Sequence, residues 1–385
     1  ATNAGSYAAT FTPKANYQWS DGSTSAKSVT WAIGKAAGSL TLAKSSVTLN
    51  ISSLTESVAV TRAGDGVISA TSSNTATAMV EVSGTSVKIT GLKAGTAKIT
   101  VKVAAGTNHT APSDKTINVT VSLPDTSLAN NTPDIIAAAA KSGQAANYWS
   151  VGDKVGIAVN GSFGGLSYNN TVYAFILGFN HNSSKEGSNR IHFLLGKISG
   201  KFVGLVDSSY GSTTSTSGAF TMNTSNTNSG GWGSSQMRSK VLGSASSPTS
   251  PTANTLMAAL PSDLRAVMKS CTKYTDNKGG GNTASNVSST TDYLFLLSEY
   301  EVFATHQYCN DAEPNYQAQY DYFKAGNSKV ANKHSATGTA AVWWLRSPNY
   351  NNINNNNYFC AVSSSGSLDY NNANNAYGVV PGFVV

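Results

Sequence analysis

The sequence predicts a multidomain protein in which an all-β sandwich is followed by a mixed α+β domain. The chain has 385 residues, more than the ~100–200 residues of one typical domain. Residues 40–122 alternate apolar and polar side chains in short runs, whereas the chain after residue 132 contains nearly continuous apolar stretches and a helical pattern. This change of pattern separates the two predicted domains.

Residues 1–35 contain two strand-like runs, at 7–11 and 29–33, with the turn signal Asp21-Gly22 between them. Two strands cannot bury a sandwich core by themselves. We therefore interpret residues 1–35 as the last strands of a preceding repeat, which would place the start of the chain inside a longer protein.

Residues 36–123 are predicted to form one complete β-sandwich. Period-two alternation marks half-buried strands, and glycine-containing turns such as Ala63-Gly64-Asp65-Gly66 and Ser83-Gly84-Thr85 separate them. The expected inward-facing residues are Val47/Leu49/Ile51, Val58/Val60, Val80/Val82, Val87/Ile89, Ile99/Val101/Val103 and Ile117/Val119/Val121.

A linker is predicted at residues 124–131, and a second domain at 132–385. Thr132 and Pro133 are suited to begin a helix. The stretches "VYAFILGF" and "DYLFLLSEYEVF" are dense enough in apolar residues to indicate buried strands, and "LPSDLRAVMKSC" has the apolar spacing of one helix face. Long polar segments between them predict loops over an α+β core.

The composition argues against several classes of function. The net charge of +7 comes from scattered Lys and Arg, without the basic cluster of a nucleic-acid-binding protein. No stretch approaches the ~18 apolar residues of a membrane span. Three widely spaced cysteines and five single histidines have no metal-site spacing, so neither a metal nor a cofactor is expected.

Asparagine dominates the C-terminal region, where it occupies seven of the nine positions 349–357. Such a tract is often disordered or prone to aggregate. Here, however, the apolar residues of "WWL" precede it and "YFCAV" and "GVVPGF" follow it, which indicates a folded segment. Because Asn tolerates loop conformations, we expect exposed and replaceable amides on a packed scaffold.

Two family resemblances fit these patterns. The stretch "SGTSVKITGLKAGTAKITVKVAAG" resembles a bacterial immunoglobulin-like repeat over about residues 36–122. Residues 130–385 resemble the variable proteins of diversity-generating retroelements, such as phage tropism determinants, through "YWSVGDKVGIAVNG", "FILGFN", "NTNSGGWGSSQMRSKVL", "FLLSEYEV", "WWLRSP" and "GVVPGF". The second resemblance implies a C-type-lectin-like fold whose variable region is about 343–385.

The same resemblance explains the asparagines. In that family the codons of the variable positions are rewritten at adenines, and the asparagine codon AAC, changed at its two adenines, can encode most amino acids and never becomes a stop codon. It implies that the ligand-binding, variable positions are Asn349, Tyr350, Asn351, Asn352, Ile353, Asn354, Asn355, Asn356, Asn357, Tyr358, Tyr370, Asn371, Asn372, Asn374, Asn375 and Tyr377. The expected scaffold residues are Trp343, Trp344, Leu345, Arg346, Phe359 and Phe383. The uniform asparagine suggests an unmutated template more than a selected binder.

The function expected from the resemblance is non-enzymatic recognition of a protein or glycan on a bacterial surface. The carrier would be a phage tail, hence a virion, or a bacterial surface adhesin, without membrane insertion. Some gut phage structural proteins with this style of immunoglobulin-like repeat assemble as trimers, so a homotrimer is a candidate assembly. Two alternatives stay open: an inert decoration protein of a tail or capsid, and a calcium-dependent glycan-binding lectin, because Glu313-Pro314-Asn315 spells the sugar-selecting triplet of such lectins.

Two further features could suggest enzyme or sugar-binding chemistry. Glu299 and Glu301 lie two apart on a predicted strand, too close to flank a glycosidic bond as an acid–base pair, so ion pairing with Arg238 or Arg346 is favoured. Trp232 could stack on a sugar, but its apolar neighbours favour a place in the core. The protein is therefore not expected to be an enzyme.

Overall fold

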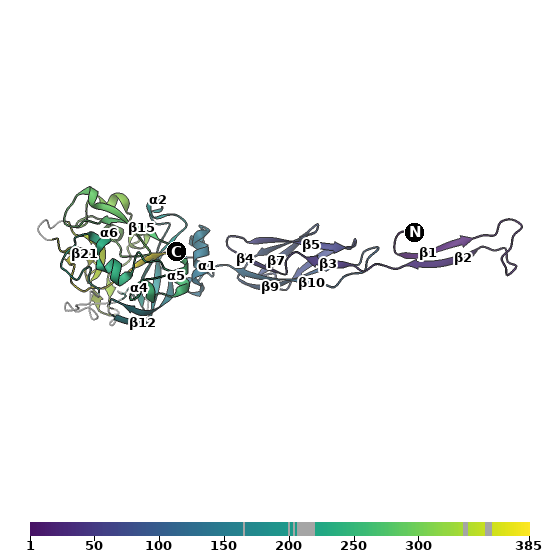
Figure 1. Cartoon of the computed structure of the whole chain (residues 1–385), viewed down its shortest axis with the longest axis horizontal. Coiled ribbons are helices and arrows are strands. Elements are labelled where there is room, and N and C mark those ends of the chain that lie inside the picture. The colour runs from purple at the N-terminus through teal and green to yellow at the C-terminus, as the bar shows by residue number, and fades with distance from the viewer. Residues whose placement is uncertain (165, 199–200, 203–204, 206–219, 334–337, 351–355) are drawn as a thin grey trace. The chain divides into compact units, whose positions relative to one another are not determined.

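The computed structural model describes residues 1–164, 166–198, 201–202, 205, 220–333, 338–350 and 356–385. The chain divides into two compact units, Ala1–Leu123 and Pro124–Val385, whose elements can be followed by colour in Figure 1. Both units are built mainly from β-strands arranged in several sheets, which confirms the coarse prediction of a β-rich, multidomain chain. Among the described residues, no helix has the length and apolarity needed to cross a membrane.

Unit 1 begins with a hairpin of its own. Strand β1 (Gly5–Phe11) pairs antiparallel with β2 (Lys27–Ile33) as a separate two-stranded sheet. Tyr7 stacks on Trp31 with ring centroids 5.8 Å apart, yet Trp31 and Val29 stay exposed. The two expected strands are present, whereas their origin in a preceding repeat remains a prediction.

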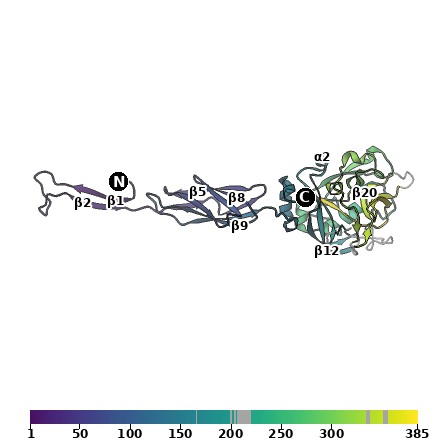
Figure 2. The same cartoon turned by 180° about the vertical axis from the view of Figure 1, so that it is seen from behind.

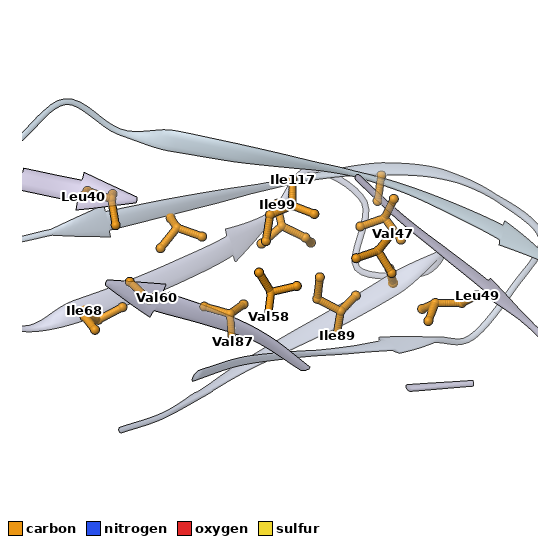
Figure 3. Close-up of a cluster of buried hydrophobic side chains, with 14 of the residues drawn as sticks. Leu40, Val47, Leu49, Val58, Val60, Ile68, Val87, Ile89, Ile99 and Ile117 are labelled. Carbon is orange, nitrogen blue, oxygen red and sulfur yellow. The ribbon is translucent and has the colours of Figure 1, made fainter. Parts of the chain in front are cut away.

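The rest of unit 1 consists of two four-stranded sheets that enclose one hydrophobic core. The sheet orders are β4-β10-β9-β6 and β3-β5-β8-β7, and only β4 and β10 pair in parallel. Val58, Val87, Ile89, Ile99 and Ile117 lie between the sheets with at most 1% exposure (Figure 3). The strands are β3 (Ser39–Leu42), β4 (Ser46–Asn50), β5 (Thr55–Ala63), β6 (Ile68–Ser72), β7 (Ala78–Ser83), β8 (Ser86–Gly91), β9 (Gly95–Val103) and β10 (Lys115–Ser122).

The segment predicted as a linker at 124–131 is instead folded into unit 2. The indole nitrogen of Trp149 donates a hydrogen bond to the Asp125 carbonyl at 2.9 Å. The Asn131 side chain is buried and donates to the Ser127 carbonyl at 2.8 Å. The polar residues of this segment therefore satisfy its own backbone, which composition alone does not distinguish from a flexible connection.

The main sheet of unit 2 has the order β11-β12-β13-β23-β17, with β14 paired to β13. The C-terminal strand lies inside this sheet, and Phe383 stacks on Phe193 with ring centroids 5.2 Å apart. The stretch "VYAFILGF" forms the second half of β12, as predicted. The strands are β11 (Lys154–Phe163), β12 (Leu166–Phe179), β13 (Ile191–Ile198), β14 (Lys201–Phe202), β17 (Leu294–Phe295) and β23 (Gly382–Val384).

Short helices and small sheets pack around this sheet. Two sequence assignments are corrected: the helix α5 ends at Val267, because Met268 is extended, and Cys271 begins a strand. The helices are α1 (Pro133–Lys141), α2 (Ser183–Glu186), α3 (Gly231–Ser234), α4 (Leu256–Ala259), α5 (Ser262–Val267), α6 (Glu299–Phe303) and α7 (Asp321–Lys324). The small sheets are formed by β15 (Cys271–Asp276) with β16 (Val287–Asp292), and by β18 (Ala331–Asn332) with β19 (Ala340–Ala341).

Within residues 343–385, the predicted variable region, three strands form an antiparallel sheet in the order β20 (Trp343–Pro348), β21 (Tyr358–Val362) and β22 (Leu368–Asn372). Figures 1 and 2 show this sheet and α1 at opposite ends of unit 2. Among the described residues, β22 is an edge strand of this sheet and pairs with β21 on one side only.

Candidate functional site

The strand β20 anchors the predicted variable region in the protein interior. The indole nitrogen of Trp344 donates to the Phe220 carbonyl at 2.8 Å, and that of Trp343 donates to the Lys329 carbonyl at 2.9 Å. Phe220, whose carbonyl accepts from Trp344, has a left-handed backbone (φ 62°), a conformation that carries some cost for a non-glycine residue. All six expected scaffold residues, Trp343, Trp344, Leu345, Arg346, Phe359 and Phe383, have at most 1% exposure.

The expected variable positions do not share one environment. Asn349 is only 2% exposed, so the expectation that it faces solvent is wrong. Its backbone continues the pairing with Tyr358 (N–H to O, 3.0 Å), and the amide of buried Asn228 donates to its carbonyl at 3.3 Å. Asn351, Asn352, Ile353, Asn354 and Asn355 lie outside the described residues.

The remaining ten positions are exposed or half-buried and form what we call the Asn/Tyr surface. Four of them, Tyr358, Tyr370, Asn371 and Asn372, lie on β21 and β22, where Tyr358 pairs with Asn372. The Asn/Tyr surface consists of Tyr350, Asn356, Asn357, Tyr358, Tyr370, Asn371, Asn372, Asn374, Asn375 and Tyr377.

Side chains on this surface also bind one another. The Tyr377 hydroxyl donates to the Asn371 side-chain oxygen at 2.9 Å, and the Tyr358 and Tyr370 rings meet edge to face at 5.2 Å. These contacts involve only partly buried groups, so each contributes little to the stability of the fold. The surface presents amide and phenol groups, which can donate, accept and pack without a fixed charge.

Three residues outside 343–385 join this surface, and sequence reasoning missed them. Tyr308 packs edge-on against Tyr370 at 4.8 Å, Asp311 accepts a hydrogen bond from the Tyr350 hydroxyl at 3.1 Å, and Asn226 donates to the Asn372 side chain at 3.1 Å. They come from loops distant in sequence from the variable region. No local pattern could have identified them.

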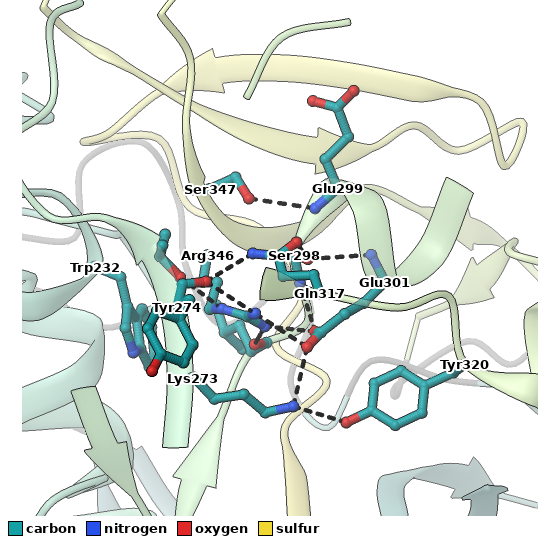
Figure 4. A network of polar contacts seen from close by, with 12 residues as sticks. Trp232, Lys273, Tyr274, Ser298, Glu299, Glu301, Gln317, Tyr320, Arg346 and Ser347 are labelled. Carbon is teal, nitrogen blue, oxygen red and sulfur yellow. Dashed lines mark hydrogen bonds and ion pairs between the residues drawn. The ribbon is translucent and has the colours of Figure 1, made fainter. Parts of the chain in front are cut away.

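Buried charged side chains form a cluster around Lys273, Glu301 and Arg346 (Figure 4). The ammonium nitrogen of Lys273 is 2.6 Å from Glu186 Oε2, 2.9 Å from Glu301 Oε1 and 2.9 Å from the Tyr320 hydroxyl. Arg346 donates to both oxygens of Glu301. Two cations and two carboxylates therefore balance in a fully buried site, and the three N–H groups of Lys273 each have an acceptor.

The pKa directions of Glu301 and Lys273 agree with this charge balance, whereas burial raises the pKa of the Glu186 carboxyl despite the nearby Lys273. Burial alone would raise the pKa of the Glu301 carboxyl, but the charges of Arg346 and Lys273 hold it well below its usual range. Burial would likewise lower the pKa of Lys273, but Glu186 and Glu301 raise it. Burial lowers the pKa of His181 to about 3, so this imidazole stays neutral at physiological pH.

Two groups of buried side chains in the described part of the chain bring donor atoms within 4.8 Å of one another: Glu186, His192 and Cys271, and His181, Glu186 and Glu301. Such sets could hold a metal ion. The Lys273 ammonium, however, already contacts both carboxylates at 2.6 and 2.9 Å. A divalent ion beside it would add unbalanced positive charge to a cluster that is already neutral. The residues therefore do not fit a metal ion while Lys273 is in place.

The two glutamates predicted on a strand lie instead on helix α6. Ser298 caps this helix, since its hydroxyl accepts from the Glu301 N–H and the Glu301 carboxylate accepts from the Ser298 N–H. The side chains of Glu299 and Glu301 point in opposite directions (Figure 4). The expected pairing of Glu301 with Arg346 is confirmed, whereas Arg238 pairs with Asp292 instead.

The lectin-like triplet does not form a surface calcium site. Glu313 is fully buried, and its oxygens accept from the Asp276 N–H (2.9 Å), the Ser347 hydroxyl (2.7 Å) and the Gln317 amide (3.2 Å). Burial raises the pKa of Glu313 to about 7. Asn315 is exposed, so the two side chains do not converge on one ion.

Trp232 lies in the core, as expected, and the three cysteines are buried as well. Trp232 is fully buried at the start of α3, and its indole nitrogen donates to Asp292 Oδ2 at 2.9 Å. Cys271, Cys309 and Cys360 are free, buried thiols. Burial raises the pKa of all three well above the ordinary value for a thiol.

Comparisons with known proteins add one family match. Residues 215–385 match the family described as Domain of unknown function (DUF6273), a range that includes the Asn/Tyr surface and most of its buried support. No curated protein matches the chain.

Two solved structures show weak likenesses to parts of the chain. The S-layer protein SbsC domains 4 and 5 share 20% identity at a TM-score of 0.19, over 25% of this chain and 58% of that chain. The E. coli chaperone DraB shares 14% identity at a TM-score of 0.18, over 37% of this chain and 91% of that chain. The chain thus spans little more than half of the SbsC structure, and neither likeness assigns its fold or function.

Proposed function

We propose that the chain is a non-enzymatic recognition protein of the diversity-generating retroelement kind. In this proposal, unit 1 supplies an immunoglobulin-like spacer, and unit 2 is a C-type-lectin-like domain whose Asn/Tyr surface contacts the target. The target is a protein or glycan on a bacterial surface, and the carrier is a phage tail or a surface-displayed adhesin.

The observation that carries the proposal is the division of the variable region into two classes of side chain. The six scaffold residues have at most 1% exposure, while ten Asn and Tyr residues interleaved with them are exposed or half-buried. Truncating a buried anchor costs about 2–5 kcal/mol, whereas most surface substitutions cost less than about 0.5 kcal/mol. The Asn/Tyr surface can therefore change while the fold is retained.

The chemistry of the surface also supports recognition. Tyr and Asn dominate antibody binding sites, because they offer apolar contact and adaptable hydrogen bonds at low entropic cost. Here four of them lie on β21 and β22, next to buried anchors such as Phe359, an arrangement that preserves binding geometry. The nearly uniform asparagine of this chain corresponds to a template sequence with weak affinity of its own.

Sequencing the 3′ end of the gene across a population tests the proposal. Substitutions should concentrate at the codons of the Asn/Tyr surface and at 351–355, while the codons of Trp344 and Arg346 stay constant. Asn349 should behave like the scaffold because it is buried. Uniform drift along the gene, or no variation at all, would instead favour an inert decoration protein.

A further inference from the structure

The loop after helix α6 brings a tyrosine from outside the variable region to the Asn/Tyr surface. The helix ends at Phe303, and Ala304 caps it with a left-handed backbone (φ 57°). The Tyr308 carbonyl then accepts a hydrogen bond from the Tyr350 N–H at 2.9 Å. Tyr308 is thereby joined to the first residue of the Asn/Tyr surface.

A buried carboxylate fixes the backbone of this loop. Glu299 is fully buried, and its two oxygens accept hydrogen bonds from the N–H groups of Gln307, Tyr308 and Cys309, at 3.1 Å for Tyr308 and 2.7 Å for Cys309. A buried carboxylate is tolerated only with such donors, and three neighbouring donors on one acceptor leave the loop little freedom. The loop is therefore held more tightly than a surface connection requires.

The ring of Tyr308 is half-buried within a small aromatic group. It meets Tyr370 edge to face at 4.8 Å, and Tyr370 meets Tyr358 at 5.2 Å. Its hydroxyl has no hydrogen-bond partner among the described residues, so it can accept or donate to a ligand. Two of these three tyrosines belong to the variable set, whereas Tyr308 lies outside it.

We infer that Tyr308 is a constant contact residue of the recognition surface, and that Glu299 is the positioning residue that holds it in place. The inference rests on the proposed function and extends it, because every ligand of the surface then meets the same phenol ring whatever the variable residues are. A pre-ordered tyrosine is a frequent centre of binding energy in protein–protein contacts. The partner class that fits is a protein surface with an apolar or cationic side chain to pack on the ring.

The experiment uses the full chain with positions 371, 372, 374 and 375 randomised, displayed and selected against hen egg-white lysozyme as the probe. Tyr308→Ala, Tyr308→Phe and Glu299→Gln are then introduced into several selected binders. Tyr173→Ala is the matched control, because Tyr173 is half-buried on β12 against Lys154, away from this surface. Affinity and melting temperature are measured for each variant.

Tyr308→Ala should weaken lysozyme binding more than about tenfold in most binders, while Tyr308→Phe keeps the ring and loses only a few-fold. Glu299→Gln should slow association, since a looser loop presents Tyr308 in the binding conformation less often. A merely structural role for Tyr308 would lower the melting temperature without this difference between Ala and Phe. If Tyr308→Ala changes the affinity for lysozyme by less than about threefold in most binders, the inference about Tyr308 is overturned and the proposed function is not. Failure to select any binder from a folded library overturns the proposed function as well.

Discussion

Replacing Glu301 with glutamine keeps the shape of the side chain but removes one negative charge from the buried cluster. The Glu301 oxygens accept from Lys273 at 2.9 Å, from the Ser298 N–H at 3.0 Å and from two nitrogens of Arg346. The variant leaves two buried cations with Glu186 as the single carboxylate. Breaking a buried ion pair in this way costs about 3–5 kcal/mol.

That cost is large against the ~5–15 kcal/mol that stabilises a typical domain. At roughly 2–4 °C per kcal/mol for a domain of this size, the melting temperature should fall by roughly 6–20 °C. Guanidinium denaturation followed by tryptophan fluorescence measures the change, because four buried tryptophans, Trp149, Trp232, Trp343 and Trp344, report on unit 2. The control is Asp263→Asn, which changes an exposed carboxylate of α5 and should lower the free energy of unfolding by at most about 1 kcal/mol. A Glu301→Gln variant as stable as this control would refute the account of the cluster.

The buried Glu313 and the three buried cysteines each give a testable prediction. Burial raises the pKa of Glu313 from 4.5 to about 7. Between these two pH values the folded state therefore binds more protons than the unfolded state. The contribution of Glu313 to stability is thus lost as the pH rises from 4.5 to 7. In urea titrations, the free energy of unfolding of Glu313→Gln should therefore rise by up to roughly 3 kcal/mol relative to that of the wild type between pH 4.5 and pH 7. A difference in unfolding free energy that stays constant with pH would contradict the raised pKa. The three buried cysteines should not react with a thiol reagent in the native protein and should all react in denaturant; a native thiol that reacts quickly would show that the core around it opens.

The sandwich of unit 1 was predictable because its physics is local. Each strand has one face against the core, so Val58, Val60, Val87 and Ile89 must alternate with polar residues along β5 and β8. The turns between strands carry their own glycine signals. Period and turn chemistry together were sufficient to place the strands without knowledge of distant contacts.

Unit 2 was less predictable because its key contacts are distant in sequence. The run "SEYEVF" is dense enough in apolar residues to resemble a strand, but Ser298 and Glu301 have the spacing of a capping box, a local helix signal that outweighs it. The partners of Glu301, Lys273 and Arg346, lie 28 and 45 residues away. No local pattern indicates that these charges meet in the interior.

At the candidate site, too, the sequence alone does not separate buried asparagines from exposed ones. Asn349 and Asn374 are chemically identical, yet Asn349 is buried beneath Asn228 and Asn374 is exposed. Residue identity could indicate a group of replaceable amides. Only the three-dimensional arrangement of the loops around β20–β22 separates the buried amide from the exposed ones.

Thermal melting of two variants tests the central claim most directly. The double variant Asn372→Ala/Asn374→Ala changes two positions of the Asn/Tyr surface and should lose less than about 1 kcal/mol. Trp344→Ala removes a fully buried ring and its hydrogen bond to the Phe220 carbonyl, and should lose about 3–5 kcal/mol. Similar losses in the two proteins would contradict a rigid buried scaffold that carries exchangeable surface residues.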